Sequence, residues 1–287
     1  MTALAGVSRA TYYRFDPEAV AAVKDVELRD AIQRIALKHP AYGRPRITAE
    51  LKRQDWEANH KRVGRILRED NLLCIRKQKF QVTTDSTHGH RIYKNLTRDV
   101  KPTKPNQIWV ADITYIRLAE EFVYLAVVLD SYSRLVIGWA LERTMEAKLA
   151  VAALRMALDK RGAPVGLIHH SDRGVQYACG QYTGLLKDRG IAISMSRKGN
   201  PYDNARAESF MKTLKHEEVH RTEYRNIAEA RRGIGNFLER TYNRKRLHSA
   251  IGYKPPAEFD KMAILEIAHR AKSSVVRDPV NEKKAPA

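Results

Sequence analysis

Residues 108–141 read IWVADITYIRLAEEFVYLAVVLDSYSRLVIGWAL, and this stretch predicts the centre of the fold. It contains three runs rich in β-branched and aromatic residues, the residue types that favour strands. Short polar turns at 119–121 and 131–133 separate the runs. Connections this short join antiparallel neighbours, so the stretch predicts three antiparallel strands.

Helix and strand patterns alternate downstream of this stretch. A helix is predicted over 146–160, a strand over 164–170, a helix over 176–189 and a strand over 191–195. Helical crossovers of this kind connect parallel strands. The sequence therefore predicts an α/β fold with a mixed five-stranded sheet flanked by helices.

A further amphipathic helix is predicted after the turn residues at 201–204. Its apolar positions recur at helical spacing and should face the core: Ala207, Phe210, Met211 and Leu214. Glu208 points away from this stripe, and Lys212 and Lys215 share its face. Taken alone, the pattern is more typical of a solvated Glu–Lys pair, which adds only a few tenths of a kcal/mol to helix stability.

The composition favours a nucleic-acid partner. The 287-residue chain carries a formal net charge of +19, and such an excess attracts polyanions. Residues 1–100 carry +8 and residues 224–287 carry +7, whereas residues 101–223 carry only +4. This distribution fits a central region that performs chemistry between two flanks that hold phosphates.

Cysteine usage and targeting signals exclude several classes of protein. Cys74 and Cys179 lie far apart, which indicates neither a disulfide framework nor a zinc site. The N-terminus has no signal-peptide pattern. The longest apolar run, 122–129, is far shorter than the roughly 20 residues that cross a bilayer. A soluble cytoplasmic protein without a membrane partner is expected.

Three short helices are predicted before the sheet, within 24–39, from Thr48 and after Asn59. Apolar stripes support the first and third: Val26, Ile32, Ile35 and Ala36, then Val63, Ile66 and Leu67. The second and third helices are strongly basic, and the side chains expected to bind duplex DNA are Arg44, Arg46, Lys61, Arg62 and Arg65. The alternative is a solvated helix pair in a basic protein.

Three acidic residues are candidates for catalysis. Asp112 lies mid-strand among apolar neighbours, where a carboxylate is unfavourable unless it is paired or bound to a metal. Asp172 follows the fourth predicted strand, at the sheet edge where α/β proteins bind ligands. The alternatives are a buried ion pair for Asp112 and a turn or helix cap for Asp172. Glu208 lies on the later helix, and Asp130 is a rival carboxylate that the following SYSR favours as a turn residue.

Brought together, the carboxylates of Asp112, Asp172 and Glu208 would form an all-oxygen site. Like charges at close range repel each other and raise carboxylate pKa values. A divalent cation removes this conflict, and hard oxygen ligands suit Mg²⁺ or Mn²⁺. Two such ions about 4 Å apart could activate an attacking hydroxyl and stabilise a leaving 3′-oxygen at phosphorus.

Residues 109–215 resemble the retroviral-integrase-type catalytic core of insertion-sequence transposases, in particular the second-frame (OrfB) protein of the insertion-sequence-three family. The matching boxes are WVADITYI, HHSDRGVQY and SRKGNPYDNARAESFMKTLK. Between Asp112 and Asp172 lie 59 residues, and between Asp172 and Glu208 lie 35, the interval of the family's D,D,35,E signature. AYGRPRI and NHKRVGRILRE are similar to its helical DNA-binding segment, and YNRKRLHSAIGYKPPAEF to its C-terminal box. Pro45 departs from the family pattern.

The resemblance implies a ribonuclease H-like fold and a DDE-type polynucleotidyl transferase. It implies that Asp112, Asp172 and Glu208 bind two Mg²⁺ ions, with Mn²⁺ as a substitute, and that Lys212 and Lys215 contact DNA beside them. It implies strand cleavage and transfer between the terminal inverted repeats of a mobile element and a target DNA. It also implies a homo-oligomer on bacterial nucleoid DNA, and a fused or separate first-frame helix-turn-helix protein.

Four segments are predicted. They are a helical DNA-binding region at 1–98 (helix-turn-helix-like over about 40–75), a Pro-rich linker at 99–106, an integrase-like catalytic domain at 107–261 and a tail at 262–287. Residues 1–15 resemble the end of a helix-turn-helix unit, and the tail is predicted to begin as a short apolar helix and end as a disordered polar segment.

Two other functions stay open from the sequence. A DNA-binding regulator would keep the basic flanks and catalyse nothing, although the intact set of three carboxylates argues against it. A structure-selective nuclease on the same fold would cut strands without joining them, since a fold does not determine a function.

Overall fold

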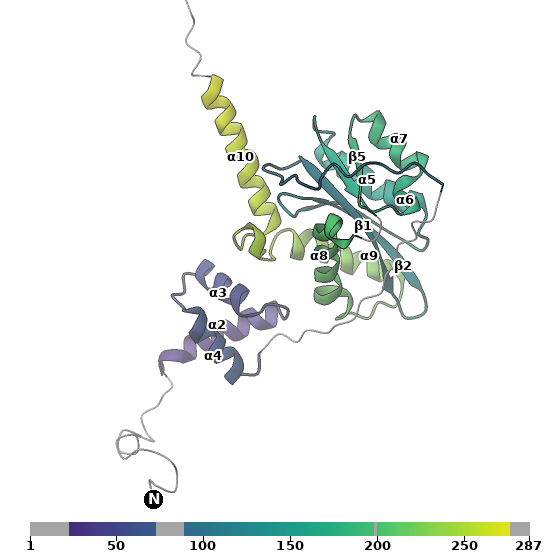
Figure 1. The fold of residues 1–287 in the computed structure, drawn as a ribbon. Helices are drawn as coiled ribbons and strands as arrows, with labels where there is room; N and C mark the ends of the chain where they lie inside the picture. Colours follow the sequence, from purple (N-terminus) through teal and green to yellow (C-terminus); the bar gives the residue numbers. More distant parts are fainter. Residues whose placement is uncertain (1–22, 73–88, 198–199, 276–287) are drawn as a thin grey trace, which may run out of the picture. The chain divides into compact units, whose positions relative to one another are not determined.

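The computed structural model describes residues 23–72, 89–197 and 200–275. The expectations for residues 1–15 and for the polar end of the tail lie outside the described residues. The chain divides into two compact units, residues 1–75 and 76–287 (Figure 1). The boundary predicted at residue 98 therefore falls inside the second unit.

Three helices make up the described part of the first unit: α2 (Val23–Lys38), α3 (Arg44–Arg53) and α4 (His60–Glu69). They share a core of Leu28, Ile32, Ile35, Ile47, Leu51, Val63, Ile66 and Leu67. The expectation for Val26 is wrong, because this side chain is 55% exposed and Leu28 takes the buried position. Helix α3 begins at Arg44 rather than at Thr48, since Pro45 suits the first turn of a helix.

The second unit is built on a five-stranded sheet. The described strands are β1 (Ile108–Arg117), β2 (Phe122–Asp130), β3 (Val136–Glu142), β4 (Ile168–Ser171) and β5 (Ala192–Met195). Their order is β3-β2-β1-β4-β5. The pairs β1–β2 and β2–β3 are antiparallel, and β1–β4 and β4–β5 are parallel. The predicted mixed sheet and both short turns are confirmed.

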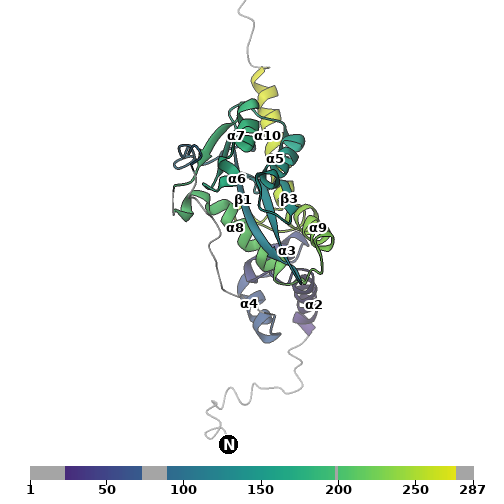
Figure 2. The same ribbon diagram turned by 90° about the vertical axis from the view of Figure 1, so that its right-hand side faces the viewer.

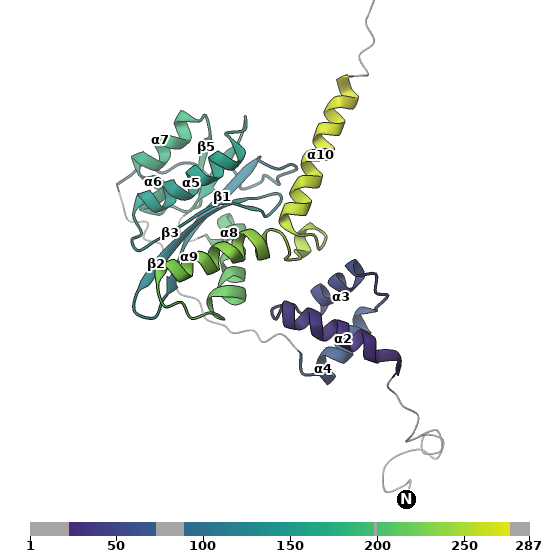
Figure 3. The ribbon, with the colours of Figure 1, turned by 180° about the vertical axis from the view of Figure 1, so that it is seen from behind.

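Helices cover both faces of this sheet. One face packs against α5 (Ala147–Arg161), α6 (Val175–Ala178) and α7 (Gly180–Asp188). The opposite face packs against α8 (Ala205–Leu214) and α9 (Ile227–Asn236). Figures 2 and 3 show the two helical layers with β1 between them. The single helix predicted over 176–189 is instead two helices that meet at Cys179.

The last described element is the helix α10 (Pro256–Val275). The boundary predicted between residues 261 and 262 lies inside α10, because no Pro or Gly interrupts the helix there. The apolar helix expected after residue 262 is thus the continuation of an earlier one. No described helix has the length and apolar character needed to cross a membrane.

Gly138 lets β3 approach α5 closely. A Cβ at this position would lie 2.2 Å from the carbonyl oxygen of Ala153 and 2.8 Å from the amide nitrogen of Ala157. Gly138→Ala should therefore lower the free energy of unfolding by roughly 2–4 kcal/mol, because helix backbone must move. Gly184→Ala is the matched control: its Cβ would meet nothing within 4 Å, and a helical Ala should stabilise by about 0.5–1 kcal/mol. Equal thermal midpoints for the two variants would contradict this packing.

Candidate active site

Asp112 lies near the middle of β1, the central strand of the sheet. Side chains two residues apart on a strand point to the same face of the sheet, so Ile108 and Val110 share the face of Asp112. Both belong to the core that α8 covers. The Cα of Asp112 is paired with that of Val127 in β2. Oδ1 of Asp112 accepts a hydrogen bond of 2.9 Å from the amide of Ile113. The carboxyl group is therefore held on the face that α8 covers.

Asp172 comes directly after β4, beside Asp112. Val110 is paired with His170 in the parallel β1–β4 ladder, so Asp112 and Asp172 both lie two residues further along. Oδ1 of Asp172 accepts a hydrogen bond of 2.9 Å from the amide of Gly174. This bond accounts for the turn that the sequence favours after the strand, and it fixes the direction of the carboxylate.

Helix α8 supplies Glu208. The predicted apolar stripe is confirmed, since Ala207, Phe210, Met211 and Leu214 are all buried against the sheet. Asn204 occupies the N-cap position, but its side chain makes no capping bond. Its Nδ2 instead donates to the carbonyl oxygen of Ala111, at 3.1 Å. This contact fastens the start of α8 to β1 one residue before Asp112, and Glu208 follows on the first turn.

The charges of the three carboxylates act on one another. The pKa of Asp112 rises to about 8, chiefly because burial removes the carboxyl group from water and next because of the charge of Asp172. Glu208 raises this pKa further, while the hydrogen bond from Ile113 and the ammonium of Lys215 oppose the rise. Burial beside like charge therefore keeps Asp112 protonated near neutral pH.

The donor set fits a divalent cation, because it consists of carboxylate oxygens with excess negative charge. A bound cation would favour the charged form of the Asp112 carboxyl group, which burial and Asp172 disfavour. In the part of the chain that the structure describes, no three His, Cys, Asp or Glu side chains already lie at the spacing of a metal site. Binding by Asp112, Asp172 and Glu208 together therefore requires their side chains to close around the ion.

Lys215 faces this region, and Lys212 lies on the exposed surface of α8. Lys215 starts a π-helical turn, η2 (Lys215–Val219), and is half-buried. Its Nζ lies 4.5 Å from the centre of the Tyr115 ring, within the range of a cation–π contact. Burial lowers the pKa of Lys215, and the charge of Asp112 opposes this shift.

The C-terminal box supports the end of α8 through Arg246, a residue that the sequence analysis did not single out. Arg246 is 3% exposed, and its guanidinium donates to both carboxylate oxygens of Glu217 at 2.8 and 2.7 Å. The bidentate pair joins the segment after η3 (Phe237–Tyr242) to η2. The sequence offers no signal that separates Arg246 from its basic neighbours Arg244 and Lys245.

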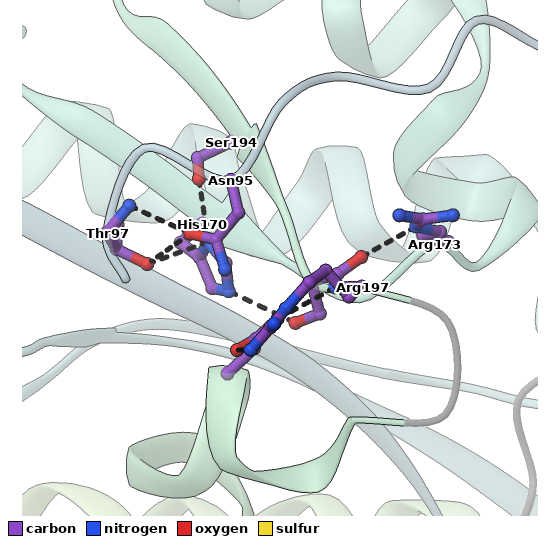
Figure 4. A network of polar contacts seen from close by, with 8 residues as sticks. Asn95, Thr97, His170, Arg173, Ser194 and Arg197 are labelled. Carbon is purple, nitrogen blue, oxygen red and sulfur yellow. Dashed lines mark hydrogen bonds and ion pairs between the residues drawn. The ribbon is translucent and has the colours of Figure 1, made fainter. Parts of the chain in front are cut away.

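A polar network around His170 joins the segment at Thr97 to the ends of β4 and β5 (Figure 4). His170 is buried, and its Nδ1 lies 2.8 Å from Oγ of Ser194 while its Nε2 lies 3.1 Å from Oγ of Ser196. Oγ1 of Thr97 lies 3.2 Å from the same Nδ1. Burial lowers the pKa of His170 to about 4, so the ring is neutral. The segment around Thr97, which was predicted as the end of the DNA-binding region at 1–98, is thus fastened to β4 and β5. These contacts explain why it belongs with the second unit.

The loop that leads to α8 is closed by an ion pair between Arg197 and Asp203 (Figure 4). The amide and the guanidinium of Arg197 donate to the carboxylate at 2.9 to 3.1 Å. The hydrogen bond from this guanidinium lowers the pKa of Asp203 strongly. Nε of Arg173, next to Asp172, donates to the carbonyl oxygen of Ser196 at 2.6 Å. These bonds brace both ends of the loop that delivers Glu208.

Tyr177 is a second residue that the sequence analysis missed. It is 2% exposed, and its hydroxyl is buried with no hydrogen-bond partner among the described residues. Burial raises the pKa of the phenol, and the charges of Tyr182, Asp112 and Asp172 add to the rise. The hydroxyl therefore lies within electrostatic reach of both aspartates. Tyr177 ends the HHSDRGVQY box, which was the available signal.

Asp130 has the role that its sequence favours. It is fully buried and accepts hydrogen bonds from the amides of Tyr132 and Ser133 at 2.9 Å and of Asn106 at 2.6 Å. Burial nonetheless raises its pKa. Its oxygens are used in holding the β2–β3 turn, so Asp130 is a turn residue and not a rival to the three carboxylates.

The basic residues predicted to bind DNA lie on α3 and α4 of the first unit. Arg44, Lys61 and Arg65 are exposed, whereas Arg46 and Arg62 are half-buried. Arg65 forms an ion pair of 2.9 Å with Glu69, and the guanidinium of Arg46 lies 5.7 Å from the centre of the Tyr42 ring. Arg44 and Lys61 are thus the most available of the set for a phosphate.

Comparison with protein-family models identifies both units. A model described as an integrase core domain matches residues 102–201, and a second model with this description matches residues 189–256. A model of an HTH-like domain matches residues 24–80. These matches, together with the mixed sheet, define a DDE-type polynucleotidyl transferase with an integrase core.

Individual relatives narrow this class. The chain is 42% identical over 220 residues to the transposase InsF for insertion sequence IS3A of Escherichia coli (strain K12), covering 76% of each protein. It is 39% identical over 259 residues to the uncharacterized 31 kDa protein of insertion element IS600 of Shigella sonnei, covering 88% of this chain and 95% of that relative. The chain belongs to the insertion-sequence-three (IS3) family of transposases. Its function is DNA transposition.

Solved retroviral integrases are more distant. The catalytic core domain of HTLV-2 integrase, solved in complex with magnesium, is 18% identical. The match covers 56% of this chain and 99% of that one, with a TM-score of 0.45.

Proposed function

We propose that this transposase cuts and joins DNA strands at the ends of an insertion sequence, with Asp112, Asp172 and Glu208 as its catalytic carboxylates. The observation that carries the proposal is the β1–β4 register, which sets Asp112 and Asp172 at matching positions of adjacent segments, together with the Asn204 contact that fastens the start of α8 to β1. The raised pKa of Asp112, caused chiefly by burial and next by Asp172, agrees with this arrangement. Carboxylates placed together at unfavourable free energy are typical of a functional site. A transposase needs such a site for displacement at phosphorus.

The three carboxylates would hold Mg²⁺, with Mn²⁺ as a substitute and two ions as the expected number. When bound, such ions favour attack by an oxygen nucleophile and stabilise the leaving 3′-oxygen. The residues of this chain set the positions of the three carboxylates. Strand β1 holds Asp112, the Gly174 amide orients Asp172, and the contact between Asn204 and β1 sets α8 beside them. Lys215 supplies positive charge next to Asp112 for a scissile phosphate.

We infer that basic residues of both units bind DNA. Lys212 and Lys215 would contact the strand near the carboxylates, and Arg44, Arg46, Lys61, Arg62 and Arg65 would hold phosphates of the terminal inverted repeat. Because transposition brings two element ends and a target DNA together, we expect the protein to form a homo-oligomer on DNA. A fused or separate first-frame helix-turn-helix protein would add recognition of the element ends. The site of action would be the nucleoid in the bacterial cytoplasm. The four proposed segments keep their roles, apart from the boundaries revised above.

A gel assay with labelled element ends tests the function. Purified protein, MgCl₂ and a duplex bearing one terminal repeat should yield strands joined to a target. Cut strands without joined products would instead support the nuclease alternative, and shifted bands without new strands would support the DNA-binding regulator. Omitting the divalent cation should abolish joining and cutting while leaving the shift.

Tyr177→Phe tests the buried hydroxyl. Because this hydroxyl is buried without a hydrogen-bond partner among the described residues, and the charges of Asp112 and Asp172 add to the effect of burial in raising its pKa, we expect it to stabilise a carboxylate during the reaction. Its loss should slow strand transfer about tenfold. An unsatisfied hydroxyl is unfavourable in a core, so the variant should unfold no earlier than the wild type. Wild-type strand transfer by Tyr177→Phe, measured at saturating DNA, would remove this role.

A further inference from the structure

The segment before β1 passes from one face of the sheet to the other beside β5, the edge strand next to β4. Tyr93 packs against the core on the α5 and α7 face, and Nζ of Lys187 on α7 lies 5.9 Å from the centre of its ring. Val100, seven residues later, packs against the core on the α8 face. Residues 91–100, the arm, therefore reach the face of the sheet that carries the carboxylates.

Alternate side chains of the arm point in opposite directions, which is the period of an extended chain. The inward positions are half-buried: Tyr93, Asn95 and Thr97. The outward positions are exposed: Ile92, Lys94, Leu96 and Arg98. The two outward cations are therefore presented to solvent by a segment whose other side is packed.

Hydrogen bonds fasten the inward side of the arm to β4 and β5 (Figure 4). The amide of Leu96 donates to Oγ of Ser194 at 2.8 Å, and Oγ1 of Thr97 lies 3.2 Å from Nδ1 of His170. The amide of Thr97 donates to Oδ1 of Asn95 at 2.8 Å, a bond within the arm that fixes its backbone. Because the backbone is held in place before a ligand binds, binding orders fewer groups and costs less entropy.

These contacts place the arm beside the strand end that Asp172 follows. Thr97 contacts His170, which precedes Asp172 by two residues, about 7 Å along an extended chain. The β1–β4 ladder pairs His170 with Val110, a residue of the core that α8 covers. Arg98, the next residue of the arm, therefore lies near the chain segment that carries Asp172.

The arm region is strongly basic. Residues 89–104 contain five Lys and Arg and one Asp, so their net charge is +4 (5 − 1). Within the described part of the chain, the side chains of Lys94 and Arg98 form no ion pair. Exposed cations elsewhere in this unit are paired, for instance Arg143 with Glu121 and Lys148 with Glu146, both at 3.0 Å. Cations fixed in place without a counter-ion attract a polyanion such as the DNA backbone.

We propose that Lys94 and Arg98 bind two backbone phosphates of the element-end DNA, along the path that leads to Asp172. This inference rests on the proposed function, which makes DNA the partner and Asp172 a catalytic residue. The element end is favoured over the target DNA, because its strand lies at the carboxylates during cutting as well as joining. Four residues of an extended chain span at most about 14 Å. One strand of a duplex advances about 3.4 Å per nucleotide, so the two phosphates lie at most about four nucleotides apart.

Binding in EDTA tests the arm without turnover. The double variant Lys94→Gln/Arg98→Gln should reduce the slope of log Kd against log salt concentration by about two, or about one per phosphate contact. The matched control is Arg143→Gln/Lys148→Gln, which removes the same charges from exposed side chains that follow β3, the opposite edge strand. The control should keep the wild-type slope, and both variants are checked for folding by thermal unfolding. Equal slopes for the arm variant and the control would overturn the proposal.

A second measurement locates the two phosphates. Element-end duplexes carry one uncharged methylphosphonate at successive positions of either strand. At two positions, at most about four nucleotides apart, the wild type should lose about fivefold in affinity and the arm variant nothing. If no position distinguishes the two proteins, while their slopes differ on a target duplex without the repeat, the arm holds target DNA and the element-end contact is refuted. Strand transfer by the wild type in MgCl₂ is scored separately, so a failed catalytic proposal is distinguished from a failed arm contact.

Discussion

Asp172→Asn is expected to lower strand transfer by at least about 10³-fold, the scale of losses when a group acting only in the transition state is removed. The amide keeps the shape of the side chain and an oxygen that can accept from the Gly174 amide, as Oδ1 of Asp172 does at 2.9 Å. It removes the negative charge that a divalent cation needs. Binding of the element end should stay within about twofold, because phosphate contacts dominate affinity.

The measurement uses one labelled duplex for both readouts. Joined strands are separated on a denaturing gel after incubation with MgCl₂, and binding is followed by a mobility shift in EDTA. Asp159→Asn is the control, because Asp159 is an exposed carboxylate on α5, on the other face of the sheet. Strand transfer at the wild-type level by Asp172→Asn would exclude Asp172 from the catalytic set.

Asp112→Asn is expected to change stability and activity in opposite directions. Burial and the neighbouring carboxylates raise the pKa of Asp112 to about 8, from an unfolded value of 3.8. The folded protein thus binds a proton that the unfolded chain has released, so stability falls as pH rises from about 4 to 8. The full shift corresponds to about 1.4 kcal/mol per pKa unit. Asp112 as a whole is only half-buried, and solvent screening reduces this effect, so we expect a gain of roughly 2 kcal/mol for the variant at pH 8.5.

Thermal unfolding in EDTA at pH 5 and pH 8.5 measures this effect. A gain of roughly 2 kcal/mol should raise the midpoint by about 4–8 °C at pH 8.5 for a unit of this size. At pH 5 the difference should be much smaller, because wild-type Asp112 is protonated there. MgCl₂ should stabilise the wild type and leave the variant nearly unchanged, while strand transfer by the variant is lost. A variant less stable than the wild type at pH 8.5 in EDTA would contradict the electrostatic account of Asp112.

Much of the fold could be predicted because it depends on local patterns. Period-two runs and short turns predicted the antiparallel strands, and helical spacing predicted the buried stripe of Phe210, Met211 and Leu214. The same approach was wrong for Val26 and for the start of α3. The exposure of Val26 depends on which of several similar stripes the neighbouring helices cover, and this is a property of packing. The start of α3 follows from Pro45 in its first turn, a local feature that was not used in the prediction.

The sequence predicted which residues belong to the candidate site, but it did not predict how they are arranged in space. The intervals between Asp112, Asp172 and Glu208 predicted the candidate residues, and their catalytic role stays a prediction. Their mutual effect on a pKa became visible only when the β1–β4 register and the Asn204 contact were known. Tyr177 and Arg246 carry no periodic signal, since each matters through partners far away in the sequence.

The sequence by itself determined the order of the elements, the acidic residues and the basic flanks, since these follow from residue type and spacing along one chain. Only the tertiary structure decided that Lys215 faces Asp112 and that the segment around Thr97 belongs to the catalytic unit. The physical reason is that burial and Coulomb interactions depend on distances in space, and folding sets these distances between residues that the sequence keeps apart.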